Sequence, residues 1–297
     1  MQEPVDRPAH DRTAEPAAPA APVPGPSPRI DRRLFLGGVG AAATALAVGQ
    51  AGAAAQAAEG PAAAALPQEM QAPSALAMRT FSRIDGTPVY YWRGDRGNTT
   101  LRSWQCTDAF YDRLVLWIRD LRNLSADGGF GNIDFLVSAG FYVNRSGQHG
   151  AGTAMDLDMV HWAGGRRCSP LDRHHAEGRT LRRRYLAVDA VCRRRFRYVL
   201  DGWYNSAHHD HIHADFGGLP TTCEKGSRSD TVFVQAMCNN FMGAGLAVDG
   251  IWGSNTQTWF NRAKNRLGIS GDPHSEIVAW RNMLARIARH GFSDTAI

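Results

Sequence analysis

The sequence predicts an α+β protein, in which a small antiparallel sheet with flanking helices is followed by a small three-helix domain. Short stretches rich in aromatic, β-branched or alternating apolar residues recur between residues 88 and 213, which is typical of short strands. Apolar residues recur at helical spacing over residues 107–121 and 181–204. The same helical spacing returns after residue 230 and continues almost to the end of the chain.

The N-terminal segment differs from the rest in composition. Residues 1–30 are polar and rich in Pro and Ala, and Asp31-Arg-Arg-Leu-Phe-Leu36 is followed by an apolar Gly/Ala-rich run. This order resembles a twin-arginine export signal. The apolar run is about 15 residues long, whereas a membrane span needs about 20. We therefore expect residues 1–55 to be a signal peptide, residues 56–76 to be an Ala/Pro-rich linker, and the protein to be secreted or cell-wall associated without a permanent membrane span.

The length and charge of the chain limit the number of domains and the kinds of partner to expect. A chain of 297 residues fits about two domains, which we place at residues 77–220 and 229–297. The net charge is +5, carried mostly by Arg, which suits an acidic or phosphate-rich surface such as an anionic wall polymer. There is no basic patch interleaved with stacking aromatic residues, so the sequence does not indicate nucleic acid as a partner.

Five cysteines are present, and none belongs to a Cys-x-x-Cys pair. A cysteine zinc site is therefore not expected. In an exported protein, two disulfide bridges and one free thiol are plausible, and the sequence leaves the pairing open.

The expected elements of the first domain follow in chain order. Residues 88–93 have strand composition, and Thr107 is a good N-cap for a helix that buries Phe110, Leu114 and further apolar residues on one face. A loop over residues 127–132 leads into a strand over residues 133–138.

A long helix is expected over residues 181–204. One face is apolar and the other carries seven arginines: Arg182, Arg183, Arg184, Arg193, Arg194, Arg195 and Arg197. Such a run is usually a solvated face. The alternative is attraction to an anionic wall polymer, which would weaken with salt.

Two stretches suggest one metal site. Ser146-Gly-Gln-His149-Gly-Ala-Gly-Thr-Ala-Met-Asp156-Leu-Asp158 joins an imidazole and carboxylates through a Gly-rich turn, and Asp210-His211-Ile-His213 follows later. The period of a strand places His211 and His213 on one face. We expect His149, Asp156 and His213 to bind zinc, with Asp158 as an alternative ligand or as a hydrogen-bond acceptor behind the ligands. Three protein ligands leave one position for water, as in catalytic zinc sites.

These residues also carry a resemblance to known families. His149-x-x-Gly-x-Ala-x-Asp156 followed by Asp-His-x-His resembles the zinc signature of D-alanyl-D-alanine carboxypeptidases and lysostaphin-type metallopeptidases. Trp203-Tyr-Asn205 before the second motif is most similar to the extensin-like C-terminal domain branch. The resemblance implies that Asp210 is the general base and that His211 stabilises the oxyanion or assists proton transfer.

The chain departs from the resembled pattern at two positions. The family usually has a serine two residues before the first zinc histidine, where this chain has Gly147, with Ser146 one step earlier. It also often has a substrate-orienting arginine after a Ser-Gly-Tyr-like turn, and Arg145 is the nearest candidate here. We therefore expect Arg145 and Ser146 to contact substrate, with Arg145 as a clamp for a substrate carboxylate.

The C-terminal residues predict three helices. Val232, Phe241 and the apolar residues between them mark the first, Ser254-x-x-Gln257 is a capping box that opens the second, and the third begins at Asp272-Pro273 and ends near Gly291. Asp249-Gly-Ile-Trp-Gly-x-x-Thr256 resembles the core motif of three-helix peptidoglycan-binding modules. The resemblance implies an anchor that raises the local substrate concentration.

These observations together predict an exported zinc peptidase that cuts peptide bonds in peptidoglycan. A rival hypothesis is a wall-binding protein whose zinc site is structural or vestigial, because the expected serine and arginine are missing. A third is a zinc hydrolase of another amide.

Overall fold

The structure is a computed structural model that describes residues 77–217 and 222–297. All described residues belong to one compact unit. The predicted export signal and linker lie outside the described residues. Within the described part, no helix is long and apolar enough to cross a membrane.

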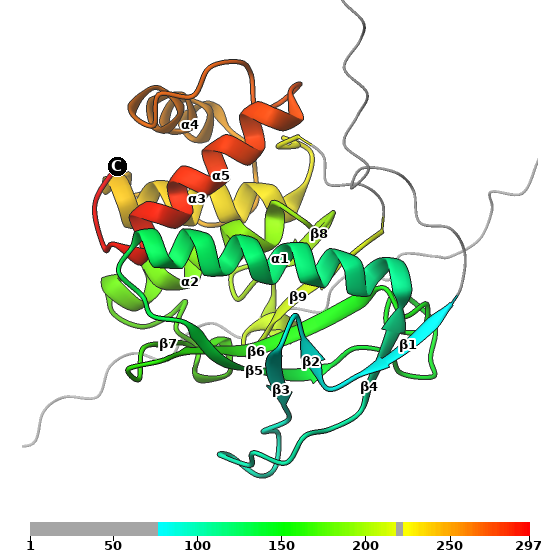
Figure 1. The fold of residues 1–297 in the computed structure, drawn as a ribbon. Helices are drawn as coiled ribbons and strands as arrows, with labels where there is room; N and C mark the ends of the chain where they lie inside the picture. Colours follow the sequence, from blue (N-terminus) through cyan, green and yellow to red (C-terminus); the bar gives the residue numbers. More distant parts are fainter. Residues whose placement is uncertain (1–76, 218–221) are drawn as a thin grey trace, which may run out of the picture. The chain divides into compact units, whose positions relative to one another are not determined.

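The strands form one larger and one smaller sheet (Figure 1). The larger sheet has the order β2-β3-β5-β6-β9-β8, with β7 also paired to β6. Its strands are β2 (Arg83–Ile84), β3 (Thr87–Tyr90), β5 (Ile133–Gly140), β6 (Ala154–Trp162), β7 (Arg167–Cys168), β8 (Tyr198–Leu200) and β9 (Ile212–Asp215). β1 (Met78–Phe81) and β4 (Trp104–Thr107) pair separately. The pairings are antiparallel except β3 with β5, which is parallel.

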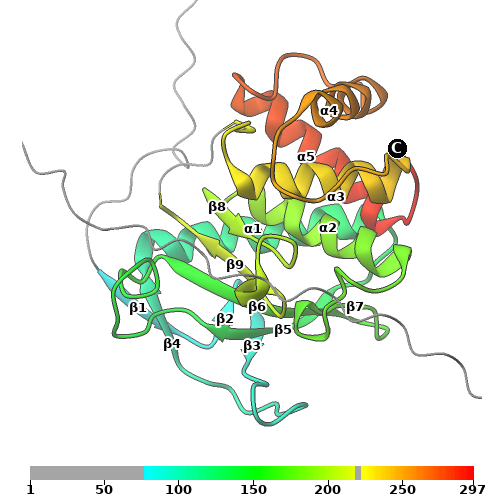
Figure 2. The same cartoon turned by 180° about the vertical axis from the view of Figure 1, so that it is seen from behind.

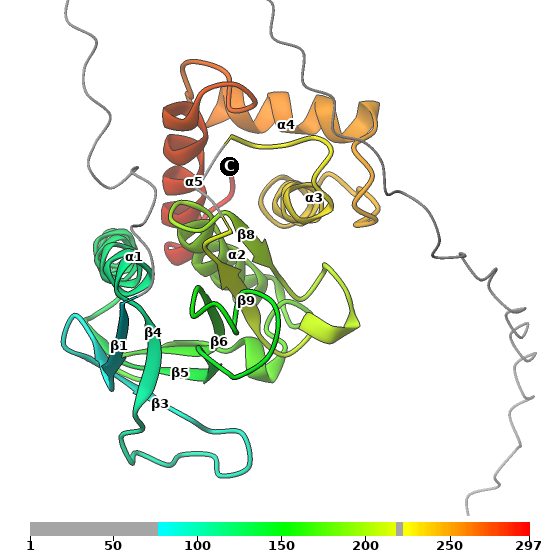
Figure 3. The ribbon, with the colours of Figure 1, turned by 90° about the vertical axis from the view of Figure 1, so that its right-hand side faces the viewer.

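The α-helices of the described residues lie on one side of the larger sheet, as Figures 1 and 3 show. They are α1 (Asp108–Asp127), α2 (Arg179–Arg193), α3 (Arg228–Met242), α4 (Ser254–Arg266) and α5 (Ile277–Phe292). Figure 2 shows β8 and β9 between β6 and these helices. The mixed α and β content confirms the predicted fold class.

Helix α1 follows the sequence prediction closely. The Thr107 hydroxyl accepts a hydrogen bond from the Phe110 N–H at 3.2 Å, which caps the helix. Phe110, Leu114 and Trp117 are fully buried on the predicted face. The local cap and the helical period were therefore sufficient to locate this element.

The long helix expected over residues 181–204 is wrong in its second half. Helix α2 ends at Arg193, and Tyr198–Leu200 forms β8, which pairs with β9. The Val199 carbonyl accepts hydrogen bonds from the Arg193 guanidinium at 3.0 Å and from the Ser229 hydroxyl. Pairing with β9 and these tertiary contacts override the helical spacing of the apolar residues.

The arginines around the end of α2 are not a solvated face. Arg193 is buried and forms ion pairs with Asp189 at 2.8 Å and with Asp230 of α3 at 3.0 Å. Arg194 and Arg195 both bind Asp120 of α1, at 2.6 and 2.8 Å. The guanidinium groups therefore connect helices inside the protein.

The three C-terminal helices pack against the rest of the described chain through one continuous hydrophobic core. Phe292 of α5 makes edge contacts with Phe130 and with Trp162 of β6. At Gly291, an added Cβ would lie 2.4 Å from the Arg183 carbonyl oxygen, so α5 approaches α2 closely at this residue. Helix α5 ends at Phe292, as predicted for a helix that stops near Gly291, and Gly291 itself is a helical residue that permits close packing.

Two predicted helix starts differ from the structure. The N-cap of α4 is Gly253, and Ser254 is the first helical residue, so the expected capping box does not form. Asp272 lies in the turn before α5, where its carboxylate accepts a hydrogen bond from the His274 N–H at 3.0 Å.

The five cysteines, expected to include two bridges, are all buried free thiols: Cys106, Cys168, Cys192, Cys223 and Cys238.

Candidate metal centre

The two sequence motifs meet on neighbouring strands. In the antiparallel pairing of β6 with β9, Asp156 lies opposite His213. Asp156 is fixed from its other side by β5, because the Ser138 hydroxyl donates to the Asp156 carbonyl at 2.8 Å. His149 comes from the loop that precedes β6 and is buried. The topology therefore brings three residues far apart in sequence to one place.

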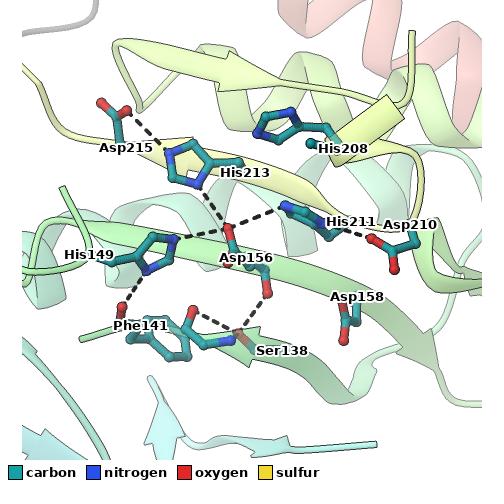
Figure 4. A network of polar contacts seen from close by, with 12 residues as sticks. Ser138, Phe141, His149, Asp156, Asp158, His208, Asp210, His211, His213 and Asp215 are labelled. Atoms are coloured by element: carbon teal, nitrogen blue, oxygen red, sulfur yellow. Dashed lines mark hydrogen bonds and ion pairs between the residues drawn. The ribbon is translucent and has the colours of Figure 1, made fainter. Parts of the chain in front are cut away.

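Three ring nitrogens converge on the Asp156 carboxylate (Figure 4). His149 Nε2 lies 3.1 Å and His213 Nδ1 lies 2.8 Å from Asp156 Oδ1. His211 Nε2 lies further away, at 3.7 Å from the same oxygen. The opposite nitrogens of two of these rings are also held: His149 Nδ1 by the Phe141 carbonyl, and His213 Nε2 by Asp215 at 3.3 Å.

This arrangement fits a divalent metal ion. One ligand atom from each of His149, Asp156 and His213 lies within 4.8 Å of the others. Two imidazole nitrogens and one carboxylate oxygen are a common zinc donor set. Metal-binding histidines also usually have their second ring nitrogen held by a carbonyl or carboxylate, as both do here. The structure thus brings together the three residues that the sequence proposed as ligands.

The charges of the centre are strongly coupled. Burial disfavours the ionised form of Asp156, but hydrogen bonds with His149 and His213 outweigh it and hold its pKa well below the usual range. Burial likewise disfavours protonated His213, but hydrogen bonds with Asp156 and Asp215 raise its pKa to about 9. The contacts with the two imidazole rings thus favour the ionised form of Asp156.

Two positions of the turn before β6 require glycine, each for a different reason. A Cβ on Gly150 would lie 1.5 Å from the Arg145 carbonyl oxygen of the same loop, so only glycine fits there. Gly152 has φ of +69°, and its carbonyl accepts a hydrogen bond from the Thr107 N–H at 2.9 Å. The turn is therefore closed by its own backbone and by the start of α1.

Asp210 and His211 lie beside the three candidate ligands. His211 precedes β9, which begins at Ile212, and its Nδ1 lies 2.9 Å from Asp210 Oδ1. The Asp210 carboxylate therefore stands behind the His211 ring, while His211 Nε2 faces Asp156 (Figure 4). Burial opposes ionisation of Asp210, but hydrogen bonds with His211 and Arg93 outweigh it and lower its pKa.

Sequence reasoning missed Arg93 in this site. Its guanidinium donates to both oxygens of Asp158, at 2.8 and 3.0 Å, and to Asp210 Oδ2 at 3.0 Å. Asp158 is fully buried, and burial raises its pKa although Arg93 opposes the shift. Asp158 therefore pairs with Arg93 and is not part of the group of candidate ligands.

His208 is a second residue that the sequence did not single out. Its ring lies 5.1 Å from the His211 ring and 6.0 Å from the His213 ring, centroid to centroid. Its burial and the neighbouring His211 lower its pKa to about 4. His209 instead contacts the Ser206 carbonyl. The run of histidines is thus divided between the centre and the surrounding loop.

The proposed substrate residues lie on the loop before His149. Arg145 and Ser146 are both exposed there. Among the described residues, the Arg145 guanidinium has no carboxylate partner, so its charge is available to a ligand. A hollow of about 260 Å³ lies at the end of β5 and is lined in part by Gly140 and Tyr142. Gly140 is the cross-strand partner of Asp156, but none of the three candidate ligands lines the hollow.

Comparison with known proteins gives one family match. Residues 139–224 match the family model described as Extensin-like protein C-terminus. The matched segment contains the three candidate ligands, Asp210 and His211, and it leaves out Arg93 and α1. No curated protein and no solved structure matches the chain.

Proposed function

We propose that this chain is an exported zinc-dependent peptidase that hydrolyses peptide bonds in bacterial peptidoglycan. The observation that carries the proposal is the convergence of His149 Nε2 and His213 Nδ1 on Asp156, with both rings held from behind. A closed structural zinc site has four protein ligands, whereas this group has three. A zinc ion held by these residues would supply Lewis acidity, which would lower the pKa of a bound water and polarise a carbonyl group.

The chain's own groups provide proton transfer. Asp210 was the general base expected from the resemblance, and its lowered pKa keeps it ionised at neutral pH. Both of its carboxylate oxygens are engaged, by His211 and by Arg93. In the Asp210–His211 pair, the atom that faces the centre is His211 Nε2. Asp210 and His211 therefore act as a unit in which His211 contacts the reacting groups and Asp210 stabilises its positive charge.

Two further parts of the chain are assigned to binding. Arg145, exposed beside the centre, is proposed to hold a substrate carboxylate, with Ser146 as its neighbour in the same contact. The helices α3, α4 and α5 are proposed to bind the cell wall, as the Asp249–Thr256 motif implies. The arginines at the end of α2, Arg193, Arg194 and Arg195, are already paired with carboxylates, so binding of an anionic wall polymer would depend on other arginines.

A second candidate is a wall-binding protein that contains zinc but does not catalyse hydrolysis. It is favoured by the replacement of the expected serine by Gly147. Hydrolysis of an amide outside the cell wall is a third possibility, and it requires the same centre.

The test is incubation of the metal-loaded protein with purified peptidoglycan, followed by mass spectrometry of the released products. Products are expected from the wild type and not after chelation, and Asp210→Ala should reduce the rate by 100-fold or more while zinc remains bound. His161→Ala is a matched control, because His161 is on β6 but stacks on Phe135. Zinc binding and wall sedimentation without products would favour the second candidate.

A further inference from the structure

Arg93 belongs to an ion-pair chain that reaches the centre from outside the segment matched by the family model. It lies beyond the end of β3, whereas its partners lie on β6 and before β9. Arg93 Nε and Nη2 bind the two oxygens of Asp158 at 3.0 and 2.8 Å. Its remaining terminal nitrogen, Nη1, binds Asp210 Oδ2 at 3.0 Å, and Nη2 also approaches the Asp210 carbonyl at 3.4 Å.

This series of ion pairs is held most firmly at its buried end, Asp158. The Asp158 side chain has no exposed surface, whereas those of Arg93 and Asp210 are 30% and 27% exposed. A planar guanidinium bound at two points by a buried carboxylate has its orientation fixed. The third nitrogen of the fork then sets where Asp210 Oδ2 can lie. Asp210 Oδ1 is consequently left to face His211 Nδ1, at 2.9 Å.

From this geometry we propose that Arg93, anchored by Asp158, is a positioning residue for His211. It holds Asp210 so that Asp210 accepts the Nδ1–H of His211, which directs His211 Nε2 at the metal centre. The identity of the tautomer follows from the acceptor: a carboxylate beside Nδ1 requires the proton on that nitrogen. The proposal deepens the proposed function, because a correctly oriented Nε2 is needed for proton transfer there.

A purely structural role for Arg93 would be to tie the segment after β3 to β6. Arg96 offers a matched comparison, because it lies in the same segment and binds Asp172 at 2.5 Å, away from the centre. If Arg93 only ties down this segment, then Arg93→Ala and Arg96→Ala should have similar effects. If it positions His211, only Arg93→Ala should change the state of that ring.

The direct test is long-range ¹H–¹⁵N NMR of histidine-labelled, metal-free, full-length protein, with His211 assigned from a His211→Ala spectrum. The wild type should show His211 with its proton on Nδ1. Arg93→Ala and Asp158→Asn should produce a mixture of tautomers, and Arg96→Ala should resemble the wild type. Arg93→Lys keeps the charge but loses the fork, so it should not restore the wild-type pattern. Guanidinium ion at a non-denaturing concentration should restore it in Arg93→Ala.

Peptidase activity gives the second readout. Loss of a residue that orients a catalytic group should reduce kcat about 10- to 100-fold with little change in KM. Unchanged His211 tautomers in Arg93→Ala, or an equal change in Arg96→Ala, would overturn the proposal. Wild-type protein without peptidase activity would refute the proposed function, and the NMR comparison would still decide the role of Arg93.

Discussion

Asp156 Oδ1 and His213 Nδ1 lie 2.8 Å apart, on residues that are direct partners in the β6–β9 pairing. Because the two strands fix both backbones, the carboxylate and the imidazole meet without support from a flexible loop. The far nitrogen of His213 is held by Asp215, which lies two residues further along β9. From this relationship we expect Asp215 to affect the metal affinity of the proposed centre, although it is not a candidate ligand.

Asp215→Ala should weaken zinc binding about 10- to 100-fold, because the His213 ring loses the acceptor that orients it. Competition with a chromophoric chelator measures the affinity. Asp134→Ala is the control, since Asp134 lies 3.5 Å from His161 and is not near the candidate ligands in the sheet. Equal zinc affinity in the wild type and in Asp215→Ala would show that the β9 backbone alone positions His213.

The convergence of the three candidate ligands could be predicted from the sequence, and the place of Arg93 beside them could not. His149, Asp156 and His213 lie in short motifs whose spacing follows from turn and strand geometry. Arg93 is 65 residues from Asp158 and 117 from Asp210 in the sequence. Its approach depends on the parallel pairing of β3 with β5, which no local pattern in the sequence specifies.

Arg193→Met should destabilise the fold by about 3–5 kcal/mol, because it leaves buried carboxylates without their cation. The Arg193 side chain is 3% exposed, and those of its partners Asp189 and Asp201 are fully buried. Urea unfolding measures the change. The comparison variant is Arg289→Met, whose pair with Asp127 is about half exposed on both sides and should contribute less than about 1 kcal/mol. Similar losses in both variants would contradict this account.

Stability should fall as the pH decreases from about 6.5 to about 4, in part because of His174. This side chain is buried, and its Nδ1 accepts a hydrogen bond from the Ser169 N–H at 3.0 Å. Burial lowers its pKa from 6.5 to about 4. In this interval the unfolded chain binds a proton that the folded protein does not, so folding loses up to about 1.4 kcal/mol per pH unit.

His174→Asn should reduce this pH dependence, because the amide oxygen can replace Nδ1 as acceptor and does not titrate. Urea unfolding at a series of pH values between 4 and 7 measures the slope. A His174→Asn variant with an unchanged slope would assign the acid sensitivity to other groups.

In the fold, as in the site, elements set by local sequence could be predicted, and elements set by tertiary pairing could not. Helix α1 was predictable because Thr107 caps it and its buried residues keep one helical period. Strand β8 was not, since Val199 continues the helical spacing of α2 and only the pairing with Ala214 of β9 makes it a strand residue. Gly291 correctly indicated the end of α5 to within one residue, although Gly291 is itself helical and is not the C-cap.

Gly291→Ala should destabilise the protein by about 1–3 kcal/mol, which reverses the usual preference of a helix interior for alanine over glycine. The added methyl group would lie 2.4 Å from the Arg183 carbonyl oxygen and 2.7 Å from the Ala187 Cβ, so α5 must move away from α2. Gly226→Ala is the control, since no atom lies within 4 Å of the Cβ position there, and it should be neutral or slightly stabilising. Urea unfolding followed by tryptophan fluorescence measures both variants.

Because the C-terminal helices share one core with the sheet, Gly291→Ala should shift a single transition. A second transition that moves alone would show instead that α3, α4 and α5 unfold as a separate unit.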